Sequence, residues 1–145
     1  MSSTWLSLAL IGVFVTSAGC SSSPAAESPG TFPAAPLMSV SSAAGTLHVD
    51  VRSSPTQPPE LGNGSWSYTI TDTTSGQPAT GLSLQVVPWM PAMGHGTSTT
   101  PSVSDMGNGV YVIDDVVLFM PGQWELRTTI SGPENDKLVV SVDIP

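Results

Sequence analysis

Alternation of apolar and polar side chains with a period of two is the feature that most constrains this chain. The alternation runs through residues 47–51, 66–70, 82–86, 124–130 and 138–144. Because successive side chains of a strand point to opposite faces, each run predicts a half-buried β-strand. Beyond the N-terminal region, no window of ten or more residues shows a helical period.

Turn signals separate these runs and add further short strands. The chain has 14 glycines and 14 prolines, and Gly62–Gly64, Ser75–Pro78, Asn108–Gly109 and Pro121–Gly122 are expected turns. Pro88 is expected to end the strand at 82–86. Further strands are expected around residue 103 and over 110–113, with 116–119 continuing the pairing. About seven short antiparallel strands in roughly 100 residues predict an all-β, immunoglobulin-like β-sandwich, with Trp66 and Trp124 as core residues.

Charge and cysteine content exclude several classes of function. The formal net charge is −8, and only Arg52, Arg127 and Lys137 are basic. A nucleic acid partner is therefore not expected. The single cysteine, Cys20, allows neither an internal disulfide nor a multi-cysteine zinc or iron–sulfur site.

The N-terminal region has the pattern of an export signal. Leu6–Val15 is an apolar run of ten residues, the length of a signal-peptide core and too short to span a bilayer. Small residues then lead to Cys20, which resembles the lipobox of bacterial lipoproteins, although residues 1–5 lack Lys and Arg and Ser17 replaces the usual aliphatic residue. The resemblance implies that residues 1–19 are a lipoprotein signal peptide and that Cys20 is lipidated, with palmitate among its acyl chains.

The remaining organisation follows from composition. Residues 20–44 are rich in Ser, Pro and Ala, which predicts a disordered tether, and residues 45–145 form the folded domain. The expected location is the cell envelope, where a membrane-anchored lipoprotein faces the periplasm. Because Ser21 is not the aspartate that retains many lipoproteins in the inner membrane, the outer membrane is slightly preferred.

Four of the six methionines lie between Trp89 and Trp124, together with one of the two histidines. Thioether and imidazole groups are soft, neutral ligands that suit Cu(I) and not Mg²⁺ or Ca²⁺. Met93 and His95 flank one glycine and are the first candidate ligands. Met106 and then Met120 are expected to reach the same end of the sandwich. The alternative is that these methionines fill the core and that His95 is a surface side chain.

The order of motifs in this segment resembles the YtkA-like domain family, which is related to FixH. The motifs are MPxMGHG at 90–96, Pro101, GxGxY at 107–111 and FMPGxWEL at 119–126. The resemblance implies an exported or membrane-attached Ig-like domain associated with copper or heavy-metal handling, with envelope metal-handling or oxidase-assembly proteins as partners. His95 and Met106 also have the His-x10-Met spacing of one group of periplasmic Cu(I) chaperones, although the downstream His-x-Met pair of that group is missing.

An enzyme is not expected. The only cysteine is assigned to the anchor, and neither histidine lies in a recognisable nucleophile motif. His48 alternates with apolar residues on a strand and should face solvent. Asp114–Asp115 has too few oxygens for a Ca²⁺ site and is expected to be a solvated turn.

Two functions therefore stay open. The first is an envelope lipoprotein that binds or handles Cu(I) through Met93, His95, Met106 and Met120. The second is a ligand-free interaction module that docks a membrane protein complex through an exposed apolar patch at Trp89, Met90 and Pro91.

Overall fold

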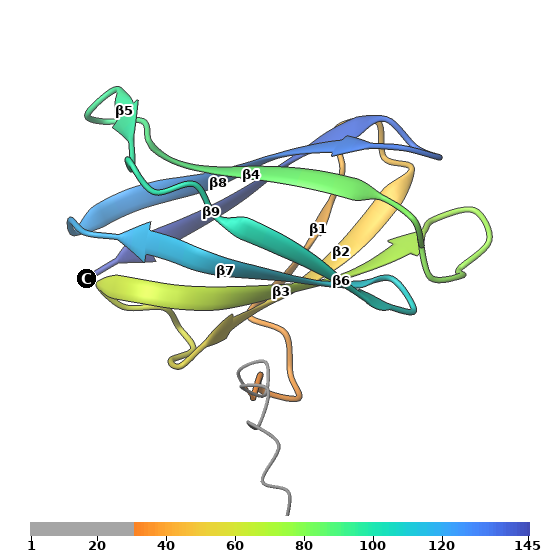
Figure 1. The fold of residues 1–145 in the computed structure, drawn as a ribbon, viewed down its shortest axis with the longest axis horizontal. Helices are drawn as coiled ribbons and strands as arrows, with labels where there is room; N and C mark the ends of the chain where they lie inside the picture. The colour runs from red at the N-terminus through yellow and green to blue at the C-terminus, as the bar shows by residue number, and fades with distance from the viewer. Residues whose placement is uncertain (1–30) are drawn as a thin grey trace, which may run out of the picture.

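The computed structural model describes residues 31–145, which form a two-layer β-sandwich. One sheet has five strands in the order β1-β2-β3-β7-β6, and the other has four in the order β5-β4-β8-β9. Every strand pair is antiparallel, and the two sheets face each other across the core (Figure 1). The predicted all-β sandwich is confirmed. None of the residues described belongs to a helix with the length and apolarity needed to span a bilayer.

The seven predicted strands are all present, and two short ones are added. The strands are β1 (Met38–Ser41), β2 (Leu47–Ser54), β3 (Gly62–Asp72), β4 (Ser83–Met90), β5 (His95–Gly96), β6 (Ser102–Gly107), β7 (Val110–Leu118), β8 (Gly122–Ser131) and β9 (Asp136–Ile144). Sequence analysis missed β1 and β5.

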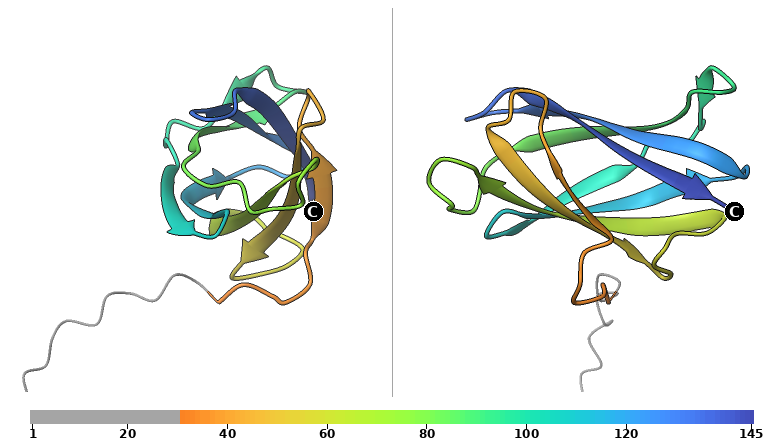
Figure 2. Two further views of the ribbon diagram at one scale, coloured as in Figure 1. Left: turned by 90° about the vertical axis from the view of Figure 1, so that its right-hand side faces the viewer. Right: turned by 180° about the vertical axis from the view of Figure 1, so that it is seen from behind.

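The core lies between the two sheets and is built by the alternating side chains. In β8 and β9, every second residue is buried, in phase with the apolar positions of the sequence. The largest core residues are Trp66 on one sheet and Trp124 on the other, at 1% and 0% exposure. Seen along its length, the molecule encloses this core between its two layers (Figure 2).

The predicted tether is wrong at its C-terminal boundary. Met38 pairs with Val51 and Ser41 with His48, so residues 38–41 add strand β1 to the edge of the five-stranded sheet. Arg52 donates hydrogen bonds to the carbonyl oxygens of Pro33 and Ala34. In residues 38–41, the partly buried Met38 and Val40 alternate with exposed serines. This short pattern was not recognised within a segment rich in Ser, Pro and Ala. Cys20, the predicted signal peptide and the tether before residue 31 lie outside the described residues.

Two strand boundaries also differ from the prediction. Strand β4 continues through Pro88 to Met90, because β4 is an edge strand apart from its two pairs with β5, and an edge tolerates the missing N–H of proline. Strand β7 is continuous from Val110 to Leu118. Asp114 and Asp115 lie within it, opposite a register shift in β3, and do not form a turn between two strands.

The sandwich has two ends, which carry different loops. The β5 end holds the β4–β5 loop (residues 91–94) and the β7–β8 loop (residues 119–121). The hairpin end holds the β6–β7 turn (residues 107–110). Figures 1 and 2 show β5 at the same end of the molecule as the C-terminal end of β7, and the β6–β7 turn at the opposite end.

Candidate metal site at the β5 end

A tight loop presents Met93 and His95 at the β5 end. The main-chain N–H groups of Met93 and Gly94 both donate to the carbonyl oxygen of Met90, at 3.2 and 3.0 Å. Gly94 has a φ of +69°, a conformation that glycine adopts readily. The chain then reverses, and Met90 pairs with His95. Met93 is therefore at the tip and 54% exposed, whereas Met90 points into the core at 4%.

The His95 ring is oriented by two contacts. It stacks on Phe119 with 6.1 Å between ring centroids and 10° between planes. Its Nδ1 lies 3.2 Å from the carbonyl oxygen of Gly96. Because a carbonyl oxygen only accepts, this contact assigns the proton to Nδ1 and leaves the Nε2 lone pair available.

Trp124 packs against the β7–β8 loop and donates a hydrogen bond to it. Phe119 packs edge-on against Trp124, with 5.5 Å between centroids and 71° between planes. The Trp124 indole N–H donates to the Met120 carbonyl oxygen at 2.9 Å. Met120 is partly buried against the core. The His95–Phe119 contact thus joins the β4–β5 loop to the β7–β8 loop, and Met93, His95 and Met120 share one end of the sandwich.

Met106 does not join them, and this part of the sequence prediction is wrong. Met106 lies near the end of β6, beside the β6–β7 turn, where Asp105 pairs with Tyr111 and Gly107 with Val110. Strand β7 then runs from Tyr111 to Leu118, a length of about 24 Å, before it reaches Met120. The prediction divided this segment into strands at 110–113 and 116–119, but residues 110–118 form one strand, so Met106 and Met120 lie at opposite ends. The His95–Met106 pair of the chaperone resemblance is separated for the same reason.

The candidate ligands at the β5 end do not include a carboxylate cluster. Within residues 31–145, no three His, Cys, Asp or Glu side chains gather closely enough to hold a metal ion. A site at the β5 end would therefore need thioether sulfur beside the one imidazole.

The apolar docking patch predicted at Trp89, Met90 and Pro91 is not formed. Met90 is buried, and Trp89 is half-buried beneath the Arg127 guanidinium, which lies 4.9 Å from the ring centroid. Pro91 alone is exposed. His48 faces solvent as predicted, with Nε2 3.4 Å from Asp50.

Sequence reasoning missed the role of Phe119. Its side chain is 49% exposed although it is aromatic, and it follows the last buried residue of β7. An apolar aromatic residue placed directly after the alternating run, before Pro121, is the signal that could have indicated a contact with a neighbouring loop.

A comparison with known families matches residues 42–129 to the YtkA-like family. The match covers more than half of the chain and includes both loops of the β5 end. The chain belongs to the YtkA-like family. No curated protein and no solved structure matches it significantly.

Proposed function

We propose that this YtkA-like domain binds Cu(I) at the β5 end, with Met93, His95 and Met120 as ligands. The observation that carries the proposal is the stacked His95–Phe119 contact, which brings together two loops that contain the methionines. Met93 is exposed, and the Nδ1 contact of His95 leaves Nε2 free to coordinate. The Met120 side chain is partly buried and has three rotatable bonds, so the proposal requires it to rotate its sulfur toward the other two ligands when Cu(I) binds.

The chemistry of the donor set favours Cu(I). Two thioethers and one neutral imidazole are ligands without formal charge. They suit a soft monovalent ion such as Cu(I) better than a hard divalent ion, which prefers oxygen ligands. The net charge of −8 adds a general attraction for cations, which does not distinguish between metals. Selectivity would therefore come from the sulfur ligands.

The proposal is tested by titrating the full chain with Cu(I), under reducing conditions, against a chromogenic Cu(I) chelator. Met93→Ala and His95→Ala are each expected to weaken binding by at least about tenfold, or about 1.4 kcal/mol. Met106→Ala is the matched control, because Met106 is as exposed as Met93, at 50% and 54%, but lies at the hairpin end. Absence of Cu(I) binding, or equal losses in Met93→Ala and Met106→Ala, would overturn the proposal.

We also propose that the domain is held in the cell envelope by lipid on Cys20, facing the periplasm. The support is the apolar run and the small residues before Cys20. Stable anchoring requires more than one acyl chain, which a lipoprotein cysteine supplies. Mass spectrometry of the mature N-terminus is expected to find an acylated Cys20 in membranes. An unmodified chain that keeps residues 1–19 would contradict this.

A further inference from the structure

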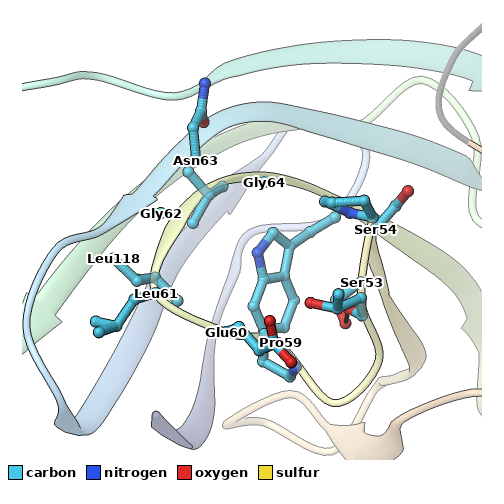
Figure 3. Close-up of a pocket in the computed structure, with 13 residues that line it drawn as sticks. Ser53, Ser54, Pro59, Glu60, Leu61, Gly62, Asn63, Gly64 and Leu118 are labelled. Carbon is cyan, nitrogen blue, oxygen red and sulfur yellow. Dashed lines mark hydrogen bonds between the residues drawn. The ribbon is translucent and has the colours of Figure 1, made fainter. Parts of the chain in front are cut away.

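A small cavity lies under the connection between β2 and β3, and it is not part of the candidate metal site. Its volume is about 90 Å³. Figure 3 shows it framed by Pro59 and Leu61 of this connection, with Ser54 of β2 and Leu118 of β7 beside it. Leu61 is 51% exposed and marks its mouth. We infer that this cavity is a binding site for a proline residue in a basic, extended segment of a partner protein.

The first observation is an indole N–H that has no acceptor among residues 31–145. Trp66 lines the cavity and is 1% exposed. Among the hydrogen bonds made by residues 31–145, the indole N–H of Trp124 donates to Met120, whereas that of Trp66 has no protein acceptor. The Trp66 indole nitrogen is also not among the fully enclosed polar atoms that lack a partner, so it reaches open space at the cavity. Solvent can therefore reach this N–H, and a ligand carbonyl oxygen can accept a hydrogen bond from it.

The second observation is the shape and polarity of the walls. Pro55 and Leu61 offer exposed apolar groups at the cavity, whereas Trp66, Val116 and Leu118 line it from almost fully buried positions, and Ser53, Thr56 and Asn63 add polar groups. A volume of 90 Å³ holds about three water molecules, which is the size of a short aliphatic group or a pyrrolidine ring. An X–Pro unit offers an apolar ring and a carbonyl acceptor, and its proline has no N–H that needs a partner.

The third observation is charge. A neighbouring hollow of about 230 Å³ shares Ser54, Pro55, Asn63 and Gly64 with the cavity and adds Asp114 and Asp115 to its lining. Asp114 accepts a hydrogen bond from the Ser65 hydroxyl, and Asp115 accepts one from the Asn63 amide at 3.3 Å.

These carboxylates have no counterion in the fold. Within residues 31–145, neither aspartate forms an ion pair, and no Lys, Arg or His lines either hollow. Glu60 adds another acidic side chain at the cavity. A Lys or Arg next to the proline of the occupant would lie over these carboxylates.

The test uses the ¹⁵N-labelled full chain and the blocked peptide acetyl-Ala-Lys-Pro-Ala-Lys-amide. The indole N–H resonance of Trp66, assigned by triple-resonance experiments on the unmodified chain, is expected to shift and to saturate with peptide concentration. Replacing the peptide proline with alanine is expected to weaken binding at least about tenfold. Replacing both lysines with glutamate is expected to abolish binding.

Two chain variants sharpen the result. Asp115→Asn is expected to weaken binding about threefold to tenfold at low salt and less at high salt, and asparagine tolerates the φ of +61° found at this position. Met93→Ala is expected to leave peptide binding unchanged, so the outcome is separate from that of the Cu(I) proposal. An unmoved Trp66 resonance at about 1 mM peptide, or equal binding of the proline-free peptide, would overturn the inference.

Discussion

The two ends of the sandwich carry equally exposed methionines in different surroundings. Met93 at the β5 end is 54% exposed and Met106 at the hairpin end is 50% exposed. Met93 is accompanied by His95 and Met120, whereas Met106 sits beside a register shift where Asp105 accepts the N–H of Gly107 at 2.8 Å. Exposure alone therefore does not separate the proposed ligand Met93 from Met106; the proposal rests on the two loops that meet at the β5 end.

Each end is fixed by one buried aromatic residue with a polar group. At the β5 end, Trp124 donates to the Met120 carbonyl oxygen. At the hairpin end, the Tyr111 hydroxyl donates to Ala79 at 3.0 Å and accepts from the N–H of Leu82 at 3.1 Å. Burial raises the pKa of Tyr111 above its ordinary value of about 10, and even at that ordinary value the hydroxyl keeps its proton and its donor role at neutral pH. The two anchors differ in size, so the loss of each is expected to lower the free energy of unfolding by a different amount.

The largest expected effect is that of Trp124→Ala. This change removes the largest core side chain of the four-stranded sheet and is expected to cost about 3–5 kcal/mol of unfolding free energy. Tyr111→Phe keeps the ring and leaves the Leu82 N–H without its acceptor, at about 1–3 kcal/mol. Urea denaturation measures both, and a smaller loss for Trp124→Ala than for Tyr111→Phe would show that the β5 end does not depend on this anchor.

Two glycines give a matched pair of intermediate effects. A Cβ on Gly96 would lie 2.4 Å from the Pro88 carbonyl oxygen, and one on Gly109 would lie 2.4 Å from that of Ile70. Either Gly96→Ala or Gly109→Ala is expected to cost about 1–3 kcal/mol. Only Gly96→Ala, which displaces the β4–β5 loop, should also weaken Cu(I) binding. Equal loss of Cu(I) affinity in the two variants would remove the distinction between the ends.

The smallest expected effect is a loss of folding stability at acid pH. It arises at Asp136, which lies at the hairpin end. Hydrogen bonds from the Ser42 hydroxyl, and from the N–H groups of Lys137 and Ala44, lower the pKa of Asp136, against a smaller opposing effect of burial. The folded state therefore binds this proton less readily than the unfolded state, and the stabilisation is present above the unfolded pKa of about 3.9. It is lost as the pH falls through the lower folded value.

Asp136→Asn tests this assignment. The variant is expected to be less stable than the unmodified chain at pH 7, and the difference should shrink as the pH drops below about 4. Urea denaturation at several pH values measures it. A difference that is constant with pH would show that Asp136 contributes packing and not charge.

Most of the fold could be predicted because the apolar residues that recur at every second position are the ones that the strands bury. In β8 and β9 the apolar positions of the sequence are the buried ones. Strand β1 was missed because four residues carry too little pattern, and β5 because it exists only through its two pairs with β4. Local sequence does not show such pairing.

The candidate site could be predicted in part. Residue chemistry indicated Met93, His95 and Met120, and the fold brings their loops together through Phe119. Met106 was placed wrongly because one continuous β7 was divided at Asp114–Asp115. Adding or removing one strand between two residues moves one of them to the opposite end of a sandwich. Polar residues at a bulge resemble a turn in the sequence, so one continuous strand is interpreted there as two.

The most direct test of the Cu(I) proposal is the ¹³C NMR spectrum of the methionine ε-methyl groups during a Cu(I) titration of the full chain. Each methyl group reports on its own sulfur, so the two ends are observed in one sample. The signals of Met93 and Met120 are predicted to shift together and to stop at one equivalent of Cu(I), while that of Met106 stays in place. A shift of Met106 equal to that of Met93, or no shift at either end, would contradict the proposal.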